Sequence, residues 1–298
     1  MNGKILAITV TWKPLVSQVC RQVDRLLDEN VDVLVIDNGS LNSEDLSIGL
    51  REYGTRVTLM KLENNFGIAY AQNRGIEIAI QQNFQYVLLM DQDSLPESNM
   101  VYKLLEALNE LPDAAAIGPN FIDDEHKTRS RFIRLERLKI VKMSSSDSPN
   151  LVEVDHLIAS GSLIPVQHLS RVGFMDESLF IDYVDIEWAL RARSMGFRSY
   201  GLFSARMFHT LGDAHLNVLR RKIAVHSPQR YYYMVRNALL LYKRPYISKS
   251  WKLVDAFKLA AKLTLLLMLS PGRIKVFKAI LYGIIHGFSN KSGKYVLK

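Results

Sequence analysis

The sequence is poor in cysteine and contains no signal-peptide pattern. Cys20 is the single cysteine among 298 residues, which excludes a disulfide-stabilised scaffold and is compatible with a reducing compartment. The opening stretch MNGKILAITV is short and strand-like, and no small-residue cleavage site follows it. The sequence therefore predicts a protein that stays in the cytoplasm.

The last third of the chain lacks acidic residues. Residues 216–298 contain 17 lysines and arginines but a single acid, Asp255, whereas residues 1–215 carry 21 basic and 29 acidic residues. Such an asymmetry is typical of a segment that faces nucleic acid or lipid headgroups. The apolar stretch 263–269 is far shorter than the roughly 20 residues that a membrane-spanning helix needs. We expect basic amphipathic helices that lie in the headgroup region, or else a helical cap that packs on the protein or on a second subunit.

The first 120 residues alternate between apolar runs and segments with helical spacing, and 48% hydrophobic residues are enough for a packed core. Strands are expected at 4–10, 31–37, 56–62, 86–94 and 114–119, and helices at 15–29, 43–53, 68–82 and 97–110. This alternation predicts an α/β fold, a twisted and mostly parallel sheet with helices on both faces. In such sheets ligands bind beyond the carboxyl ends of the strands.

The pattern changes after residue 120. The segment 121–155 is charged and rich in turn residues, and we predict a mobile excursion there. A helix near 184–196 and strands near 198–209 follow. The remaining predicted helices cover about 228–243, 251–269 and 272–288. We therefore expect a catalytic domain at 1–215, with halves at about 1–120 and 150–215, and a basic amphipathic helical extension at 216–298.

Acidic side chains stand at the ends of two predicted buried strands. Asp37 ends the second strand, and Asp91, Gln92 and Asp93 end the fourth. Residues i and i+2 of a strand share a face, so Asp91 and Asp93 can converge on one hard cation such as Mg²⁺ or Mn²⁺. Each acid also has a simpler interpretation, because Asp37 begins good turn chemistry and surface acids are common. The coincidence at one sheet edge favours a metal-diphosphate site.

The segment NNFGIAYAQNRGI (64–76) lies between these acids. Asn65 and Gly67 suit a loop with unusual backbone angles, and Asn73 is in reach of a phosphate or base. Its small residues instead suit a helix that packs tightly on the sheet. A nucleotidyltransferase should have a glycine-rich basic loop after the first strand, but TWKPLVSQV (11–19) has no glycine. A nucleic-acid-binding protein would leave Asp91 and Asp185 unexplained.

Six segments together resemble the family-2 inverting glycosyltransferases, which have the GT-A fold. The resemblance covers about residues 4–213 and rests on VTWKP (10–14), VIDNGS (35–40), NNFGIAYAQNRG (64–75), DQDS (91–94), SGS (160–162) and DYVDIEWALR (182–191). The variants DQDS, FIDYVDIEW and HTLGD (209–213) most resemble bacterial rhamnosyltransferases. Those enzymes use dTDP-L-rhamnose to build O-antigen and related lipopolysaccharide components.

The resemblance assigns roles by matching position. It places Asp185 on the general base, although the position before it, acidic in the wider family, is Val184 here; Asp182 is the alternative base or an acceptor ligand. The implied nucleotide-sugar ligands are Thr11, Asp37, Asn38, Asn65, Gly67, Asn73, Asp91 and Gln92. The implied acceptor-side residues are Ser160, Gly161, Glu187 and Trp188, and the implied metal ligands are Asp93 and His209. Glu187 also has ion-pair spacing to Arg191, and a lone histidine is more often structural.

These roles imply an inverting, metal-dependent transfer of a sugar, with L-rhamnose from dTDP-L-rhamnose favoured and a UDP-hexose as the alternative. The acceptor would be a glycan, such as one linked to polyprenyl diphosphate. We expect peripheral contact with the inner face of the bacterial cytoplasmic membrane through the basic extension. No nucleic-acid partner is expected, and a homo-oligomer joined through the extension is the alternative to membrane contact.

Overall fold

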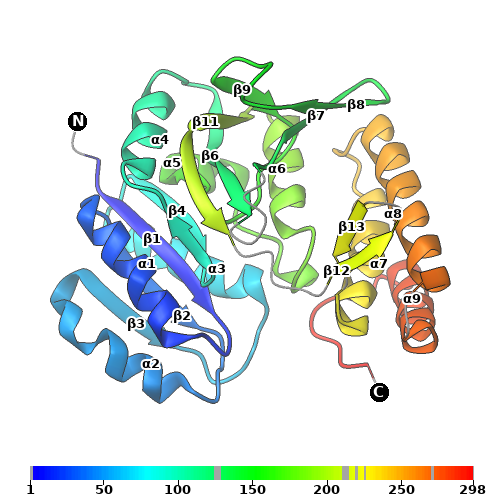
Figure 1. Cartoon of the computed structure of the whole chain (residues 1–298), viewed down its shortest axis with the longest axis horizontal. Coiled ribbons are helices and arrows are strands. Elements are labelled where there is room, and N and C mark those ends of the chain that lie inside the picture. The colour runs from blue at the N-terminus through cyan, green and yellow to red at the C-terminus, as the bar shows by residue number, and fades with distance from the viewer. Residues whose placement is uncertain are drawn as a thin grey trace.

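The computed structural model describes residues 3–123, 129–209, 215–218, 221–224, 226–269 and 272–297 (Figure 1). The first half contains β1 (Ile5–Thr11), α1 (Val16–Asp28), β2 (Asp32–Asp37), α2 (Ser43–Leu50), β3 (Val57–Lys61), α3 (Ile68–Gln81), β4 (Tyr86–Asp91), β5 (Ser94–Pro96), α4 (Met100–Asn109) and β6 (Ala114–Asp123). These elements match the predicted alternation of strands and helices.

The second half begins with strands and ends in helices. It contains β7 (Phe132–Glu136), β8 (Lys139–Met143), β9 (Leu151–Val154), β10 (Leu163–Pro165), α5 (Val166–Val172), α6 (Val184–Ser194), β11 (Arg198–His209), β12 (His215–Val218), β13 (Arg221–Ala224), α7 (Pro228–Tyr242), α8 (Lys249–Leu269) and α9 (Arg273–Phe288). Two 3₁₀ helices, Arg51–Arg56 and Glu177–Leu179, complete the set. The three predicted C-terminal helices are confirmed within two residues at each end.

One mixed sheet organises the molecule. Its strand order is β3-β2-β1-β4-β10-β6-β11-β5, and β9 pairs with β11. The strands β3, β2, β1 and β4 run parallel, which aligns Thr11 with Asp37 and Val10 with Asp91. The polar strand ends found in the sequence therefore meet at one edge of the sheet, as predicted.

Both faces of the sheet are covered because its central strands are apolar on both sides. Ile8 and Ile36 point into one core, and Ala7 and Val35 into the other. A Cβ atom added at Gly75 would lie 2.6 Å from Ile8 Cγ2, so helix α3 packs on β1 too closely for any residue larger than glycine at this position. The simpler interpretation of the 64–76 segment, a helix packed closely on the sheet, is confirmed.

The predicted mobile excursion at 121–155 is wrong for most of its length. Strands β7 and β8 pair in register from Phe132↔Met143 to Glu136↔Lys139, and β9 joins the main sheet beside β11. Apolar and charged residues do not alternate regularly in these strands, because Lys139 and Lys142 of β8 lie on opposite faces, so the sequence pattern did not indicate them. Residues 124–128 lie outside the described part.

The C-terminal helices α7, α8 and α9 lie together beside the sheet, and α7 packs mainly against α9 (Figure 1). Within the described residues, helices long and apolar enough to cross a membrane are absent. Large apolar side chains are nevertheless exposed on α8 and α9.

Candidate active site

Asp37 closes the carboxyl end of β2 beneath the site. It is completely buried, and its carboxylate accepts hydrogen bonds from Thr11 Oγ1 at 3.0 Å and from the Ser40 backbone N–H at 3.0 Å. The Ser40 hydroxyl also donates to it. Thr11 and Asp37 are thus adjacent, as their resemblance-based roles require, and they fix the ends of β1 and β2 to each other.

The segment Asp91–Ser94 is held from behind by buried polar side chains. The Asp91 backbone N–H donates to Ser160 Oγ at 3.0 Å, and that hydroxyl donates to Ser94 Oγ at 2.8 Å. The Gln22 amide donates to the Asp91 carbonyl at 2.7 Å. Ser160 is only 1% exposed, and the Gly161 backbone N–H donates to the Leu89 carbonyl. Ser160 and Gly161 therefore act as the support of the acid segment, behind its carboxylates.

Gln92 joins this segment to the end of β1. Its side-chain oxygen accepts from the Trp12 backbone N–H at 2.7 Å, and its amide donates to the Trp12 carbonyl at 3.3 Å. The Trp12 ring itself is 49% exposed. Gln92 fixes an exposed aromatic ring beside the strand ends, an arrangement that suits stacking on a planar base.

The loop before α3 adopts a geometry that only glycine permits. The side-chain oxygen of Asn38 accepts a hydrogen bond from the Phe66 backbone N–H at 2.9 Å. The side-chain oxygen of Asn65 accepts one from the Gly67 backbone N–H at 3.0 Å. Gly67 has φ +95°, and a Cβ there would lie 2.5 Å from the Phe180 carbonyl oxygen. This loop therefore touches the turn that leads to α6, which connects the two halves of the site.

Asn73 lies inside the protein, hydrogen-bonded to the segment that precedes α6. Its amide donates to the Met175 carbonyl at 3.0 Å and to Glu177 Oε1 at 2.8 Å, and its oxygen accepts from the Met175 N–H at 2.9 Å. It is 3% exposed. Because its polar atoms are engaged in fastening the segment before α6, the geometry argues against the predicted contact with the nucleotide sugar.

The turn that precedes α6 is strained. Phe180, Asp182 and Tyr183 have φ of +67°, +64° and +65°, the left-handed region that non-glycine residues avoid at a cost of roughly 1–2 kcal/mol each. Strained backbone of this kind persists only where surrounding contacts determine it, and it is often found at functional sites. We call residues 179–183 the catalytic turn.

Helix α7 supplies the contacts that hold the catalytic turn. The Asn237 amide lies 2.9, 2.8 and 2.9 Å from the carbonyl oxygens of Leu179, Ile181 and Asp182. Arg236 donates to the Leu179 carbonyl at 2.8 Å and lies 4.8 Å from the Tyr233 ring centre. Both side chains are completely buried. The sequence analysis missed this pair, and an Arg-Asn dipeptide inside an apolar helix was the available signal.

Asp185 stands in the first turn of α6 at the junction of the two halves. Burial raises the pKa of its carboxyl group, and the negative charges of Asp91 and Asp182 raise it further. The positive charge of His156 and a hydrogen bond from the Ile186 N–H at 2.9 Å lower it by less. His156 Nδ1 is buried without a hydrogen-bond partner, and burial lowers the pKa of this imidazole. Asp185 is therefore a carboxylate of raised basicity close to the donor-side acids.

Asp182 is engaged with the C-terminal segment. Its Oδ1 lies 3.1 Å from Arg230 Nε, and its Oδ2 is buried without a hydrogen-bond partner. Burial raises its pKa, against the positive charges of Arg230, His226 and Lys262. The two candidate bases are thus neighbours, but Asp182 already has a cation beside it.

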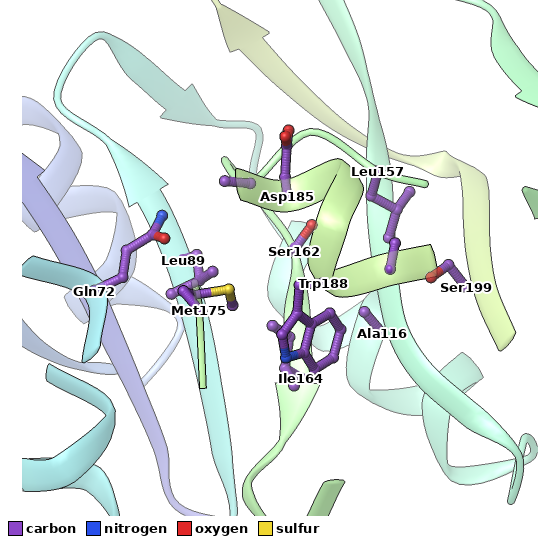
Figure 2. A pocket seen from close by; sticks show the side chains of 12 residues that line it. Gln72, Leu89, Ala116, Leu157, Ser162, Ile164, Met175, Asp185, Trp188 and Ser199 are labelled. Carbon is purple, nitrogen blue, oxygen red and sulfur yellow. The ribbon is translucent and has the colours of Figure 1, made fainter. Parts of the chain in front are cut away.

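A small pocket lies beneath Asp185 (Figure 2). In this view the Asp185 carboxylate points away from Trp188, whose ring lies in the interior. Trp188 is 3% exposed and donates from Nε1 to the Gly173 carbonyl at 2.8 Å. Trp188 therefore supports the helix that carries Asp185, and its predicted place on the acceptor side stays a prediction.

Glu187 is a structural residue in this fold. Its carboxylate is 1% exposed and accepts from Arg191 Nε at 2.8 Å, Arg191 Nη2 at 2.9 Å and the Tyr246 hydroxyl at 2.5 Å. Arg191 also donates to the carbonyls of Val172 and Phe174. This network ties α6 to the segment after α7, so the contacts favour the ion-pair interpretation, while the acceptor-side role stays a prediction.

The Glu187→Gln variant is expected to lower the free energy of unfolding by about 3 kcal/mol, because it removes the buried partner of the Arg191 guanidinium, which is only 21% exposed. Thermal unfolding measures the loss, while kcat at a temperature below the transition should stay within a few-fold of wild type. A fall in kcat above about a hundredfold with unchanged unfolding would restore a role for Glu187 in the reaction.

The position of His209 is described for its backbone alone. In β11 this residue is in register with Ser94 of β5 and with Asp123 of β6. Its backbone thus lies beside the residue that follows Asp93. The His209 side chain and residues 210–214, which include the rest of HTLGD, lie outside the described part. Among the described side chains, groups of three or more His, Cys, Asp or Glu residues that could hold a metal ion are absent.

Known proteins resemble the chain along its whole length. It is 28% identical over 295 residues to the dTDP-rhamnosyl transferase RfbF of Shigella flexneri, covering 98% of each chain. It is 21% identical to the low-salt glycan biosynthesis hexosyltransferase Agl10 of Haloferax volcanii, covering 88% of this chain and 84% of the relative.

Solved structures share the fold. The mannosyltransferase PcManGT of Pyrobaculum calidifontis, in complex with GDP-Man and Mn²⁺, superposes with a TM-score of 0.61 at 13% identity, covering 98% of this chain and 88% of that one. GalNAc-T7 with UDP, GalNAc and Mn²⁺ gives a TM-score of 0.59 at 11% identity, and the match covers 90% of this chain but 58% of that one. The predicted GT-A fold is confirmed.

The family model described as glycosyl transferase family 2 matches residues 11–167, more than half of the chain. The match runs from the end of β1 across the Asp91–Ser94 segment to the start of α5 and includes most of the donor-side residues described above. The chain is a glycosyltransferase and belongs to glycosyl transferase family 2.

Proposed function

We propose that the protein transfers L-rhamnose from dTDP-L-rhamnose to a glycan acceptor, with inversion at the anomeric carbon. The observation that carries this proposal is the full-length likeness to a dTDP-rhamnosyl transferase, which extends through the catalytic turn and the C-terminal helices. The same chemistry with a UDP-hexose is the alternative. Family membership favours either transfer over nucleotidyl transfer or nucleic-acid binding.

The donor would lie across the carboxyl ends of β1, β2 and β4. In this proposal Thr11, Asp37 and the exposed Trp12 ring receive the nucleoside, and Asn38, Asn65 and Gly67 shape the adjoining loop. Asp91 and Gln92 belong to the same surface. Support comes from the register that aligns these residues at one sheet edge.

Asp185 would act as the general base. A carboxylate whose pKa is raised by burial holds a proton more strongly than a free one, which suits removal of a proton from an acceptor hydroxyl. The oxygen then attacks the anomeric carbon as the bond to the diphosphate breaks, and this single displacement inverts the stereochemistry. Asp182, paired with Arg230, would bind the acceptor beside it.

Mg²⁺ or Mn²⁺ fits the donor set at this edge. Asp93 offers a carboxylate, and the β5–β11 register brings the His209 backbone next to Ser94. Hard divalent cations accept a few protein ligands together with phosphate oxygens. Such an ion, when bound, neutralises charge on the departing diphosphate.

The C-terminal helices would contact the inner face of the bacterial membrane, where lipid-linked O-antigen precursors are assembled. Phe257 and Phe277 are 70% and 54% exposed, among basic residues, which is typical of an interfacial helix. A second copy of the chain covering this face is the competing explanation. Equal sedimentation with and without anionic vesicles would favour the second copy.

Calorimetry with dTDP-L-rhamnose, UDP-glucose and UDP-galactose, each with and without Mn²⁺, tests the donor. We expect binding of dTDP-L-rhamnose that strengthens at least about tenfold with the metal, equal to about 1.4 kcal/mol. Binding of a UDP-sugar instead would keep the reaction class and reject rhamnose. Failure of all three donors would contradict the proposed donor surface.

A further inference from the structure

Helix α8 presents one face to the catalytic turn. One stripe along this helix consists of residues spaced four, three and four positions apart, namely Trp251, Asp255, Lys258 and Lys262. Asp255 Oδ2 accepts from the Tyr183 hydroxyl at 2.9 Å and from the Tyr242 hydroxyl at 2.7 Å. These contacts fix the first half of α8 against the catalytic turn and determine where the two lysines lie.

The two lysines extend this stripe over the acceptor side of the site. The positive charge of Lys258 acts on His156 and Asp255, and that of Lys262 acts on Asp182. Among the described residues neither lysine has a carboxylate within 4 Å, and Lys262 Nζ has a weak contact with Met234 Sδ at 3.9 Å.

Neutralising the neighbouring acids does not account for the two lysines. Asp182 already has Arg230 at 3.1 Å, and two tyrosine hydroxyls satisfy Asp255. Burial lowers the pKa of Lys262, so the fold holds a cation there at a cost. Two cations one turn apart that lack carboxylate partners are suited to a ligand with more than one negative oxygen.

The other faces of the C-terminal helices are apolar and exposed. Phe257 and Met268 of α8 are each 70% exposed, and Ile274 of α9 is 71% exposed. An acceptor that combined an apolar chain with an anionic group would therefore meet apolar side chains and the lysine stripe on the same helix.

We propose that Lys258 and Lys262 bind the phosphate or diphosphate group of a lipid-linked acceptor and so place its sugar beside Asp182 and Asp185. This inference rests on the proposed function, since it assigns the acceptor to the side of the site that α8 covers. The donor diphosphate belongs to the opposite side, at the ends of β1 and β4.

The test is calorimetric binding of decyl diphosphate to the full chain, with Mg²⁺ and saturating dTDP to fill the donor surface. The double variant Lys258→Met/Lys262→Met should bind the probe at least about tenfold more weakly. Affinity for dTDP should not change. Lys258→Arg/Lys262→Arg should retain most of the binding, and Lys139→Met/Lys142→Met, which removes the same charge from the exposed β7–β8 hairpin, should bind like wild type.

Equal weakening in the hairpin variant would show unspecific charge attraction and overturn the proposal. A weaker affinity for dTDP in the α8 variant would assign the lysines to the donor and also overturn it. Inorganic pyrophosphate distinguishes the source: tighter binding of decyl diphosphate supports a lipid-borne group, and equal binding shows that a free diphosphate suffices. If wild-type protein does not bind dTDP, that result contradicts the proposed function and not the role of the lysines. The single variant Lys258→Met, at an exposed position, keeps the test valid if the double variant unfolds.

Discussion

Asp185→Asn is expected to reduce kcat by about 10²–10⁴-fold, the usual contribution of a general base, while binding of the donor stays unchanged. The amide cannot accept the proton of the acceptor hydroxyl, yet it keeps the size of the carboxylate and its contact with the Ile186 N–H. Initial rates with saturating donor and acceptor measure kcat, and calorimetry measures donor affinity.

The pH dependence gives an independent check on Asp185. Burial raises its pKa above the ordinary value of 3.8, so the base is lost as pH falls through that raised pKa. The acid limb of kcat/KM should therefore lie above pH 3.8 in wild type and be absent from the residual activity of Asp185→Asn. Asp182→Asn is the matched control, and its main effect should be on the KM for the acceptor. The reverse pattern would exchange the two roles.

Asn237→Ala is expected to lower kcat at least about tenfold although Asn237 is completely buried behind the catalytic turn. The variant removes the amide that donates to three carbonyls of the catalytic turn. Without it, left-handed Asp182 and Tyr183 can relax by roughly 1–2 kcal/mol each toward ordinary backbone angles, which displaces Asp185.

The discriminating measurement for Asn237→Ala is the split between kcat and the KM for the donor. A positioning role lowers kcat and leaves donor KM near wild type, because the strand-end surface is untouched. Asn109→Ala, at an exposed position at the end of α4, controls for loss of an asparagine. If thermal stability falls while kcat of the folded fraction is unchanged, Asn237 is structural only.

The meeting of the polar strand ends at one sheet edge was predictable because its information is local. Apolar runs that end in Thr11, Asp37 and Asp91 identify buried parallel strands, and parallel strands present their carboxyl ends at one edge. Register then follows from the fold. No such local rule exists for Asn73, whose partner Met175 lies far along the chain. The four-residue spacing indicated the pair of Glu187 with Arg191, but it did not indicate the contact of Glu187 with Tyr246. Their motif positions indicated substrate contacts, whereas the hydrogen bonds show supporting roles.

The β7–β8 hairpin illustrates a second limit of sequence reasoning. Its strands carry charged residues on both faces, since Lys139 and Lys142 of β8 are three residues apart. Composition therefore indicated a mobile segment, and the sequence shows no strand period that would have corrected it. The catalytic turn illustrates a third limit. The sequence of Phe180–Tyr183 does not indicate a left-handed backbone, because hydrogen bonds from helix α7 impose that conformation.

The contacts of Arg236 and Asn237 have a consequence for biosynthesis of the chain. Arg236 joins Leu179 to the Gly293 carbonyl, so the catalytic turn is secured by residues made almost last. A nascent chain can form the parallel sheet and its nucleotide surface long before it can hold Asp185 in place. If the proposed roles hold, we expect a prematurely terminated chain to retain the donor surface but to lack an ordered base, so that it binds nucleotide sugar without transferring it.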